Sequence, residues 1–287
     1  MAPNTPKIWL ITGSSSGLGL EICLAAQEAG HIVIASSRSP SKTPGLVARI
    51  EARGGAWIEL DVMSSALEAQ LAKAVGIHGR IDVLVNNAGF AASSTIEDTP
   101  IELAQSIMAT NYLGPLRTCK AIIPTMRGAG SGTIVNVSSA EGVCATPTLA
   151  CYTASKHALE GLTKTLVAEV AAFGIRVLLA APGEIRTNLN AAGTLVPVSE
   201  SYGGGICGVV QQHLLDRHGR QVGDPAKMAR RIVEAVDGTG LVGRREGMVR
   251  LPLGMDVGGR IGRIGQSMVD EAKNLEDIWK STDFDGL

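Results

Sequence analysis

The stretch I-W-L-I-T-G-S-S-S-G-L-G, residues 8 to 19, joins a short apolar run to a glycine-rich turn. Ile8 to Ile11 has the composition of a buried strand, and Gly17 to Ala29 has the pattern of a helix. Glycines between a strand and a helix allow a tight turn and a close backbone approach to a ligand. The helix N-terminus offers free N–H groups and a positive dipole end to a pyrophosphate. The segment therefore predicts the first β-turn-α unit of an α/β fold.

The alternation of apolar runs and helical patterns continues along the chain. Further strands are predicted at Ile32 to Ala35, Trp57 to Leu60, Ile81 to Val85, Thr133 to Val137 and Ile175 to Ala180. Helical patterns cover Pro44 to Arg53, Ser64 to Val75, Ile101 to Arg127 and Cys151 to Phe173. Strands separated by helix-length segments indicate a parallel sheet with right-handed crossovers. We therefore expect an α/β fold, a doubly wound parallel sheet with helices on both faces, in a single domain over residues 1–287.

The pattern changes after Pro182-Gly183. Residues 188–223 contain scattered apolar residues without a clear period, and we expect an irregular substrate lid there. Asp224-Pro225 predicts a helix start, with Asp as the cap and Pro at the first helical position. Met248 to Leu251 is a candidate last strand.

Residues 253–287 form a C-terminal extension. Its glycine-rich run at 258 to 265, G-G-R-I-G-R-I-G, is a weak helix former that suits a flexible link. Gln266 to Lys280 contains enough apolar residues for a docking helix.

Composition and charge exclude several classes of protein. The net charge is −1 and the pI is near 6.5, so no basic surface is expected for nucleic acid or anionic lipid. The five cysteines, an odd number without C-x-x-C spacing, indicate reduced thiols. No apolar run has the length of a membrane span or of a signal peptide core. We expect a cytoplasmic protein without nucleic-acid, membrane or metal partners.

Tyr152 and Lys156 are a candidate catalytic pair. Spacing of four residues puts both on one helix face. A nearby ammonium stabilises a phenolate and lowers the pKa of a tyrosine, which would let Tyr152 exchange protons near pH 7. Ser139 follows the predicted strand ending at Val137, at the edge where open α/β sheets bind ligands, and its hydroxyl would polarise a carbonyl. Taken alone, Y-x-x-x-K also fits an ordinary surface pair.

The glycine-rich turn supports a second interpretation. Its spacing, G-x-x-x-G-x-G, differs from the commonest dinucleotide fingerprint and from a P-loop. It also contains G-x-S-x-G with Ser15 at the centre, which is the nucleophile elbow of α/β-hydrolases. A hydrolase needs an Asp and a His within reach of Ser15, and none of the five histidines has a recognisable context. The hydrolase also leaves Tyr152 and Lys156 without a role.

The end of the second predicted strand indicates the cofactor. NAD enzymes place a carboxylate about 20 residues past the glycines to hold the ribose hydroxyls. That place is taken by Ser36-Ser37-Arg38, and no carboxylate follows until Glu51. Because arginine pairs with a 2′-phosphate, the sequence predicts NADP(H). The alternative is that Arg38 is a plain surface residue.

Polar residues also follow the third and fourth predicted strands. Asp61-Val62 ends the third, and Asn86-Asn87-Ala88-Gly89 ends the fourth. Small residues there let a ligand approach the backbone closely. Asn111 is a poor helix former inside a predicted helix and marks a local distortion.

These motifs together resemble the short-chain dehydrogenase/reductase family. The resemblance rests on T-G-S-S-S-G-L-G, N-N-A-G, Asn111, S-S at 138 and 139, Y-T-A-S-K at 152 to 156 and P-G-E-I-R-T at 182 to 187. It covers roughly residues 7 to 190 and implies a Rossmann-type fold. The family spacing of thirteen residues to the tyrosine selects Ser139 rather than Ser138.

The resemblance implies a role for each matching residue. Ser139 would orient the substrate, Tyr152 would be the general acid/base, Lys156 would lower the tyrosine pKa and bind the nicotinamide ribose, and Asn111 would support a proton relay. The implied cofactor contacts are Gly13, Ser15, Gly17, Leu18, Gly19, Arg38, Asp61, Val62, Asn87, Ala88, Gly89, Tyr152, Lys156, Pro182, Gly183, Ile185 and Thr187.

Substrate contacts and assembly rest on fewer residues. The expected pocket is mainly apolar and is lined by Phe90, Glu141, Cys144, Leu149, Glu184 and Tyr202. Glu141 is either a ligand for a substrate amine or hydroxyl or a solvated loop carboxylate. The chain lacks the usual ending of shorter family members and resembles longer ones. The helices Ile101 to Arg127 and Cys151 to Phe173 resemble the family's dimer interface, so a homodimer is expected.

The leading hypothesis is an NADP(H)-dependent oxidoreductase that transfers hydride between nicotinamide and a ketone or secondary alcohol. Protein groups would supply position, a proton and an oxygen-polarising hydrogen bond. The alternatives are a sensor that binds NADP(H) without turnover, and the hydrolase that uses Ser15.

Overall fold

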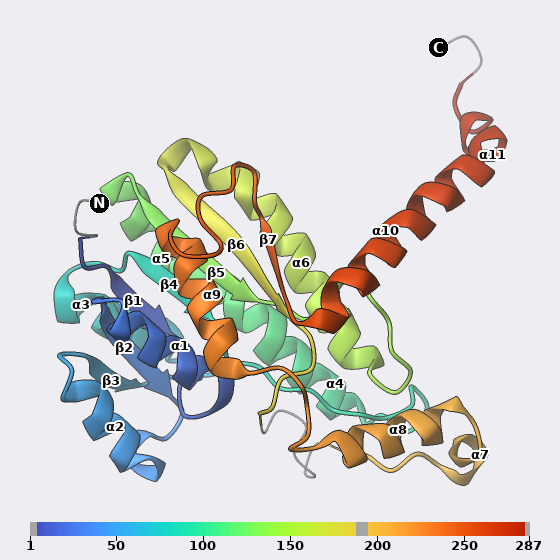
Figure 1. Ribbon diagram of the computed structural model, residues 1–287, viewed down its shortest axis with the longest axis horizontal. Helices are drawn as coiled ribbons and strands as arrows, with labels where there is room; N and C mark the ends of the chain where they lie inside the picture. Colours follow the sequence, from blue (N-terminus) through green and yellow to red (C-terminus); the bar gives the residue numbers. More distant parts are fainter. Residues whose placement is uncertain (1–4, 188–194, 285–287) are drawn as a thin grey trace.

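A seven-stranded parallel sheet forms the centre of the computed structural model, which describes residues 5–187 and 195–284 (Figure 1). The strand order is β3-β2-β1-β4-β5-β6-β7. The strands are β1 Ile8–Ile11, β2 Ile32–Ser37, β3 Ala56–Glu59, β4 Val83–Asn86, β5 Gly132–Val137, β6 Ile175–Pro182 and β7 Arg250–Leu253. The doubly wound α/β prediction is confirmed, and each predicted strand is present within two or three residues of its expected bounds.

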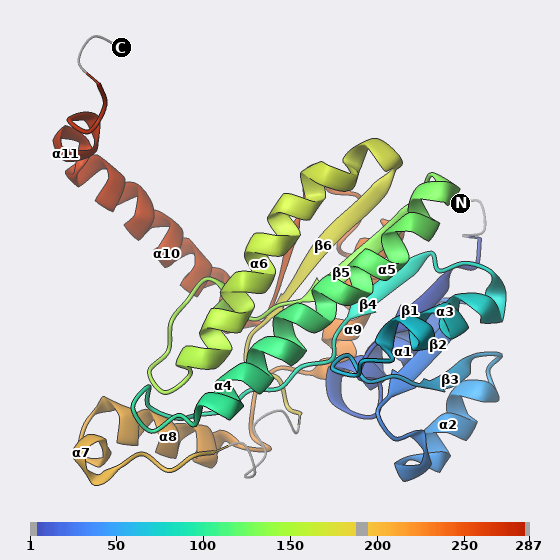
Figure 2. The same ribbon diagram turned by 180° about the vertical axis from the view of Figure 1, so that it is seen from behind.

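Helices cover both faces of the sheet. They are α1 Gly17–Glu28, α2 Pro44–Glu51, α3 Leu67–His78, α4 Ile101–Met108, α5 Gly114–Ala129, α6 Ala150–Val170, α7 Glu200–Gly203, α8 Ile206–Arg217, α9 Pro225–Asp237, α10 Met255–Asn274 and α11 Glu276–Lys280. α1 and α9 pack together on one face. The view from behind shows α3, α5 and α6 on the other (Figure 2).

Two cores follow from the alternation of side chains along the strands. Trp9, Val33 and Val135 point toward α1 and α9, whereas Leu10 and Ile134 point toward α3, α5 and α6. Parallel strands covered on both faces need apolar residues on both faces, which explains their continuous apolar runs. Burying one such side chain contributes roughly 1.5–3 kcal/mol.

The strand order reverses between β1 and β4. β1 pairs with β2 on one side, through Ile8 opposite Ile32, and with β4 on the other, through Trp9 opposite Val83. The first half of the sheet grows outward from β1 to β3, and the second half grows outward from β4 to β7. A crevice beyond the carboxyl ends of the strands at such a reversal is where α/β folds bind ligands.

The helix predicted at Ile101 to Arg127 is continuous but distorted. Residues Ala109–Leu113 form a π-helical turn between α4 and α5. Asn111 lies in that turn, which confirms the distortion expected there. π-turns in α-helices often occur at functional sites.

Two expectations for the C-terminal third are wrong. Residues 195–223 are not irregular, because α7 and α8 occupy most of them; residues 188–194 of the predicted lid lie outside the described residues. The glycine-rich run at 258 to 265 is not a flexible link, because it lies inside α10. No helix in the described part of the chain is both long and apolar enough to cross a bilayer.

Candidate active site

The glycine-rich turn connects β1 to α1 beside the end of β4. Gly13 has φ +71°, and a Cβ there would lie 2.9 Å from Ala88 Cα. A Cβ on Gly19 would collide with Gly13 O and with the Asn87 side chain. Ser16 precedes α1 without making a side-chain cap. The two glycines therefore let the turn pack directly against the end of β4, and the uncapped helix start fits a pyrophosphate group.

Thr12 holds this turn against the end of β4, a contact that sequence reasoning missed. Its Oγ1 accepts hydrogen bonds from the N–H groups of Asn87 and Ala88, each at 3.0 Å. Asn87 Nδ2 in turn donates to Thr12 O at 2.9 Å and to Gly13 O at 3.1 Å. The Asn87 side chain and the N–H groups of Asn87 and Ala88 are therefore used inside the protein, where they hold the turn in place.

The remaining cofactor candidates lie along the same edge of the sheet. Arg38 directly follows β2, is exposed and makes no ion pair within the described residues. Asp61 follows β3 and accepts a hydrogen bond from Met63 N at 3.0 Å, with Val62 buried beside it. Thr187, in the segment after β6, lies against Gly17. The others, found in the loop after β4, the start of α1 and the end of β6, are Gly89, Ser15, Leu18, Pro182, Gly183 and Ile185.

The structure brings Ser139, Tyr152 and Lys156 together. Ser139 follows β5, while the other two lie on the first two turns of α6. The Ser139 hydroxyl lies near enough to the Tyr152 hydroxyl to lower the pKa of Tyr152. Lys156 Nζ lies 5.7 Å from the centre of the Tyr152 ring and donates to Val137 O at 2.8 Å. Tyr152 and Lys156 are 7% and 5% exposed, so the pair is not an ordinary surface pair.

The pKa of Tyr152 differs from the expected direction. Burial raises the pKa of Tyr152 to about 12, the Ser139 hydroxyl lowers it, and the nearby Glu141 charge raises it. Burial also lowers the pKa of Lys156 to about 8. The expected lowering of the tyrosine pKa by Lys156 is therefore absent, because the cost of burying the phenolate is larger.

Asn111 is fully buried in the π-turn. Its Oδ1 accepts from Phe90 N at 3.0 Å, and its Nδ2 donates to Phe90 O at 2.9 Å and to Ser155 Oγ at 3.0 Å. Ser155 Oγ donates to Tyr152 O at 2.7 Å. Asn111 thus ties the loop after β4 to the helix that carries Tyr152.

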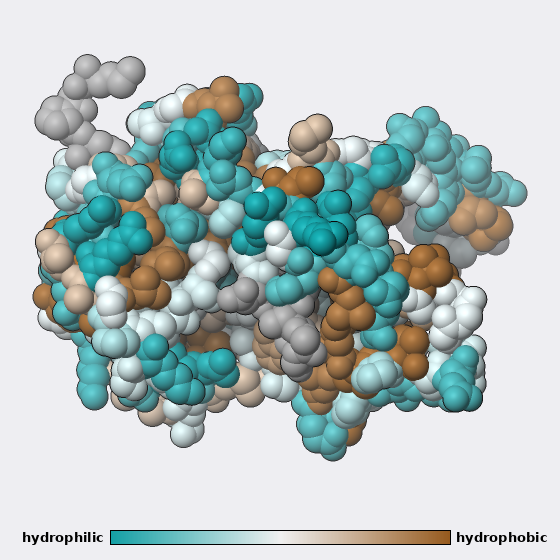
Figure 3. All heavy atoms as spheres, turned by 60° about the horizontal axis from the view of Figure 1, so that its bottom comes forward, coloured by the Kyte–Doolittle hydropathy of each residue, from teal (hydrophilic) through white to brown (hydrophobic). Residues whose placement is uncertain are grey.

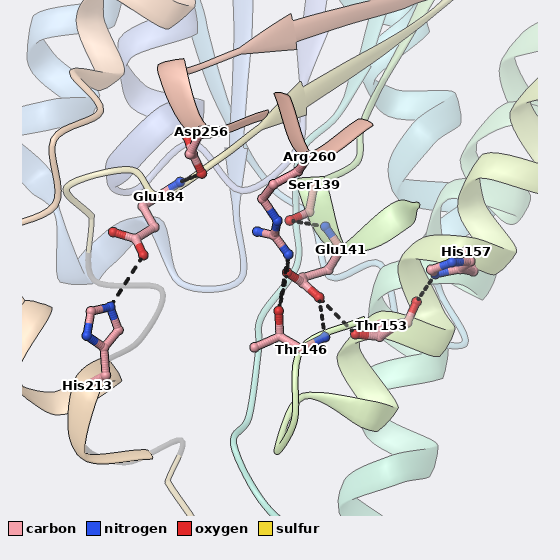
Figure 4. Close-up of polar contacts among 9 residues, drawn as sticks. All are labelled: Ser139, Glu141, Thr146, Thr153, His157, Glu184, His213, Asp256 and Arg260. Carbon is pink, nitrogen blue, oxygen red and sulfur yellow. Dashed lines mark hydrogen bonds and ion pairs between the residues drawn. The ribbon is translucent and has the colours of Figure 1, made fainter. Parts of the chain in front are cut away.

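Glu141 is engaged by the protein itself (Figure 4). Arg260 Nη2, from α10, lies 2.6 Å from Glu141 Oε1. Thr146 donates to the same carboxylate through its N–H at 3.0 Å and its hydroxyl at 2.8 Å, and Thr153 donates at 3.3 Å. The Glu141 side chain is only 7% exposed, so its interpretation as a solvated loop carboxylate is wrong, whereas its role as a substrate contact stays a prediction. Arg260 could not be recognised from sequence, because 119 residues separate it from Glu141.

Glu184 and Tyr202 are likewise paired within the protein. Arg217 of α8 donates to Glu184 Oε2 through Nε at 3.1 Å and Nη2 at 2.7 Å. Tyr202 donates its hydroxyl to Glu97 Oε2 at 2.8 Å. The Glu184 side chain is still 40% exposed, and the place of both residues in the substrate pocket stays a prediction.

Three further residues were predicted to line the substrate pocket, and two of them lie in the loop after β5 together with a strained residue. Cys144 is buried, while Phe90 and Leu149 are half-buried. Thr148 has φ +70°, which is rare for a β-branched residue, and its hydroxyl accepts from Ser93 Oγ at 2.9 Å. Such strain persists only where the surrounding structure enforces it, which fixes this loop in one shape.

The hydrolase interpretation has no support in the geometry. His31 is bound to Asp237 at 2.8 Å and stacks on Trp9, but it precedes β2 and lies at the amino end of the sheet. Ser15 lies at the carboxyl end. His157 accepts or donates within its own helix, and His213 lies 4.0 Å from Glu184. No described histidine is bonded to Ser15.

Comparison with known proteins identifies the family. Residues 7–194 match the sequence profile of the short chain dehydrogenases. The chain belongs to this family. Its relatives in this family are oxidoreductases, and solved members bind NAD or NADP, so this chain is an oxidoreductase.

Individual family members extend the match beyond residue 194. The oxidoreductase claN of Passalora fulva is 44% identical over 195 residues, covering 67% of this chain and 88% of that protein. A short-chain dehydrogenase from Streptomyces avermitilis is 34% identical, with a TM-score of 0.86 over 98% of this chain and 100% of that chain. A gluconate 5-dehydrogenase from Burkholderia cenocepacia, solved with NADP and tartrate, is 27% identical, with a TM-score of 0.71 over 88% of this chain and 95% of that one. The family fold therefore covers nearly the whole chain.

Proposed function

We propose that this short-chain dehydrogenase is an NADP(H)-dependent oxidoreductase that interconverts a ketone and a secondary alcohol on a mainly apolar small molecule. The observation that carries the proposal is the buried contact between the Tyr152 hydroxyl and Ser139, with Lys156 beneath the ring. A hydroxyl pair of this kind fits a carbonyl oxygen, which accepts two hydrogen bonds.

The protein's part in the reaction follows from the state of these groups. The cofactor, when bound, supplies or accepts the hydride. Because its pKa is about 12, Tyr152 holds its proton at neutral pH and donates it to the substrate oxygen during reduction. Ser139 donates a hydrogen bond to the same oxygen and orients it. In oxidation the steps run in reverse, and it is the phenolate form of Tyr152, stabilised by the Lys156 charge, that takes the proton from the alcohol.

Lys156 and Asn111 support the tyrosine. With a pKa of about 8, Lys156 is charged at neutral pH, and its charge stabilises the phenolate that forms transiently. Asn111 holds the backbone of Phe90 and the Ser155 hydroxyl, and so fixes the first turn of α6 against the loop after β4. The proton-relay role implied for Asn111 is part of the proposal.

The preference for NADP(H) rests on Arg38. Its guanidinium is exposed directly after β2, where the cofactor ribose is held in this fold, and no carboxylate stands beside it in sequence. A related gluconate 5-dehydrogenase was solved with NADP. A cation at this position favours a 2′-phosphate over free hydroxyls.

An apolar substrate is supported by the ion pairs that the carboxylates near the site form within the protein. Glu141 is paired with Arg260 and Glu184 with Arg217, which removes two anchors for a cationic ligand. Apolar side chains on and after α8 are exposed instead: Ile206 is 63%, Val209 64% and Val222 67% exposed. Figure 3 shows apolar surface, in brown, on the face of the molecule that this view turns forward.

Assembly and location complete the proposal. The helices α4, α5 and α6 lie in the layer on one face of the sheet and are the expected homodimer interface. All five cysteines are free, which suits the reducing cytoplasm.

One experiment tests the proposal and separates it from a sensor that only binds cofactor. Oxidation of NADPH and of NADH is followed at about 340 nm against a panel of ketones, quinones and steroid-like carbonyls. Tyr152→Phe removes the proton donor and is expected to lower kcat at least a thousandfold, because general acid catalysis and carbonyl polarisation both depend on this hydroxyl. The variant is expected to bind NADPH as the wild-type protein does. NADPH binding without turnover in the wild-type protein across the panel would support the sensor, and unchanged turnover in Tyr152→Phe would overturn the catalytic assignment.

A further inference from the structure

α10 carries an apolar stripe that the rest of the protein covers only at its base. Its members follow at intervals of three and four residues: Val257, Ile261, Ile264, Met268, Ala272 and Leu275. Val257 is fully buried, whereas Met268 is 66% and Leu275 50% exposed. Trp279 of α11 adds to the stripe, because its indole N–H donates to Ala272 O at 2.8 Å and its side chain is 49% exposed. Figures 1 and 2 show the helix leaving the body of the protein.

The helix is too weak to stand unsupported in water. Gly258, Gly259, Gly262 and Gly265 lie within it, and each costs about 1 kcal/mol of helix stability relative to alanine. Helices in proteins gain most of their stability from packing an apolar face against another element. The exposed stripe is the face available for that packing.

The charged side chains on the rest of α10 and α11 indicate which kind of partner covers the apolar stripe. Four basic and five acidic side chains lie between Asp256 and Lys280. Helices that bind a lipid surface carry mainly Lys and Arg on the polar face, so this balance disfavours a membrane. The two arginines fall in the first half, and four of the five carboxylates fall in the second. Such a helix is complementary to a copy of itself running the opposite way.

We propose that α10 pairs antiparallel with α10 of a second copy of this chain, about a two-fold axis near Ser267. Arg263, Ser267 and Glu271 follow at i, i+4 and i+8 along one side of the stripe. An antiparallel arrangement centred on Ser267 places Arg263 of each helix opposite Glu271 of the other, as the symmetry of an isologous interface requires. Arg263 forms no ion pair with any residue in the described ranges, so its charge is available. The interface is separate from the helical layer of α4, α5 and α6.

Sedimentation of the full-length protein tests the pairing. Met268→Glu puts a charge in the centre of the stripe and is expected to halve the mass of the assembly, or to weaken association at least a hundredfold. Gln266→Glu adds the same charge to the opposite side of α10 and is the matched control, expected to keep the wild-type mass. Circular dichroism and NADPH binding are used to check that both variants remain folded.

A charge exchange tests the orientation. Arg263→Glu and Glu271→Arg are each expected to weaken association about tenfold, because each sets like charges opposite one another. The double variant exchanges the charges and is expected to restore association if the helices are antiparallel.

Three results would overturn the proposal. The first is that Met268→Glu leaves the mass of the assembly unchanged, and the second is that the double charge variant associates no better than either single variant. The third is that the wild-type protein shows no α10-dependent association but sediments with vesicles of about 30% phosphatidylserine. The first two refute the pairing or its direction, and the third assigns the stripe to a lipid surface.

Discussion

Arg260 of the C-terminal helix forms an ion pair at 2.6 Å with Glu141, which lies two residues after Ser139. Glu141 is 7% and Arg260 28% exposed at the side chain. Glu141 also binds both polar groups of Thr146. The C-terminal extension therefore holds the loop that leads from Ser139 to Tyr152.

Replacing Arg260 is expected to weaken the protein and its substrate binding. Arg260→Met leaves the Glu141 carboxylate buried with fewer partners, at a cost of about 1–3 kcal/mol in the free energy of unfolding. KM for the carbonyl substrate is expected to rise about tenfold while NADPH affinity is unchanged. Urea unfolding and steady-state kinetics measure both. Arg49→Met, at an exposed arginine on α2, is the control. The double variant with Glu141→Gln is expected to be less destabilised than Arg260→Met, since no unpaired charge remains.

The rate of carbonyl reduction is expected to fall above about pH 8. The pKa of Lys156 is lowered to about 8, so rising pH removes its charge first, while Tyr152, with a pKa of about 12, stays protonated. Loss of the ammonium leaves the developing phenolate without its cation. A profile of kcat against pH between about 6 and 10.5 measures this descending limb. Lys156→Arg, which stays charged, is expected to be slower but to lack the limb; a limb of equal position in that variant assigns it to another group.

Reversing the charge at Arg38 is expected to change cofactor choice. Arg38→Asp replaces a phosphate partner by a carboxylate that suits ribose hydroxyls, so kcat/KM for NADPH is expected to fall at least a hundredfold, equivalent to about 2.7 kcal/mol. Activity with NADH is expected to stay equal or to rise. Arg49→Asp, an exposed arginine on α2, controls for net charge. A wild-type preference for NADH contradicts the role given to Arg38.

A methyl group at Gly19 is expected to damage the dinucleotide loop. Gly19→Ala forces the new Cβ against Gly13 O and the Asn87 amide, so cofactor affinity is expected to fall at least tenfold with a lower Tm. Gly161→Ala is the opposite case, because that position in α6 faces open space and the change is expected to add about 0.5–1 kcal/mol of stability. Cofactor titration and thermal unfolding of both variants make the comparison.

The sheet and the catalytic edge could be predicted because they depend on local patterns. Apolar runs such as Ile8–Ile11 report buried parallel strands directly, and polar residues at their carboxyl ends must meet at one edge. The distortion at Asn111 was also visible, since asparagine competes with the helical backbone. The catalytic and cofactor roles themselves stay predictions.

Residues that act through long-range contacts could not be predicted in this way. Thr12, Arg217 and Arg260 are ordinary in sequence and gain their roles from partners dozens of residues away. The glycines of α10 predicted a flexible link because helix propensity depends on local sequence. The structure has a helix there instead, and its start is held against the rest of the protein by the buried Val257 and by the Arg260 ion pair.

The sequence by itself determined the α/β class, the dinucleotide turn and the group of Ser139, Tyr152 and Lys156, because short-range spacing and strand ends specify them. Only the tertiary structure decided the protonation of that group and the use of the neighbouring carboxylates. Burial reverses the expected direction of the Tyr152 pKa, and ion pairs between distant elements occupy Glu141 and Glu184. Desolvation and pairing depend on what surrounds a side chain in space, which neighbours in sequence do not specify.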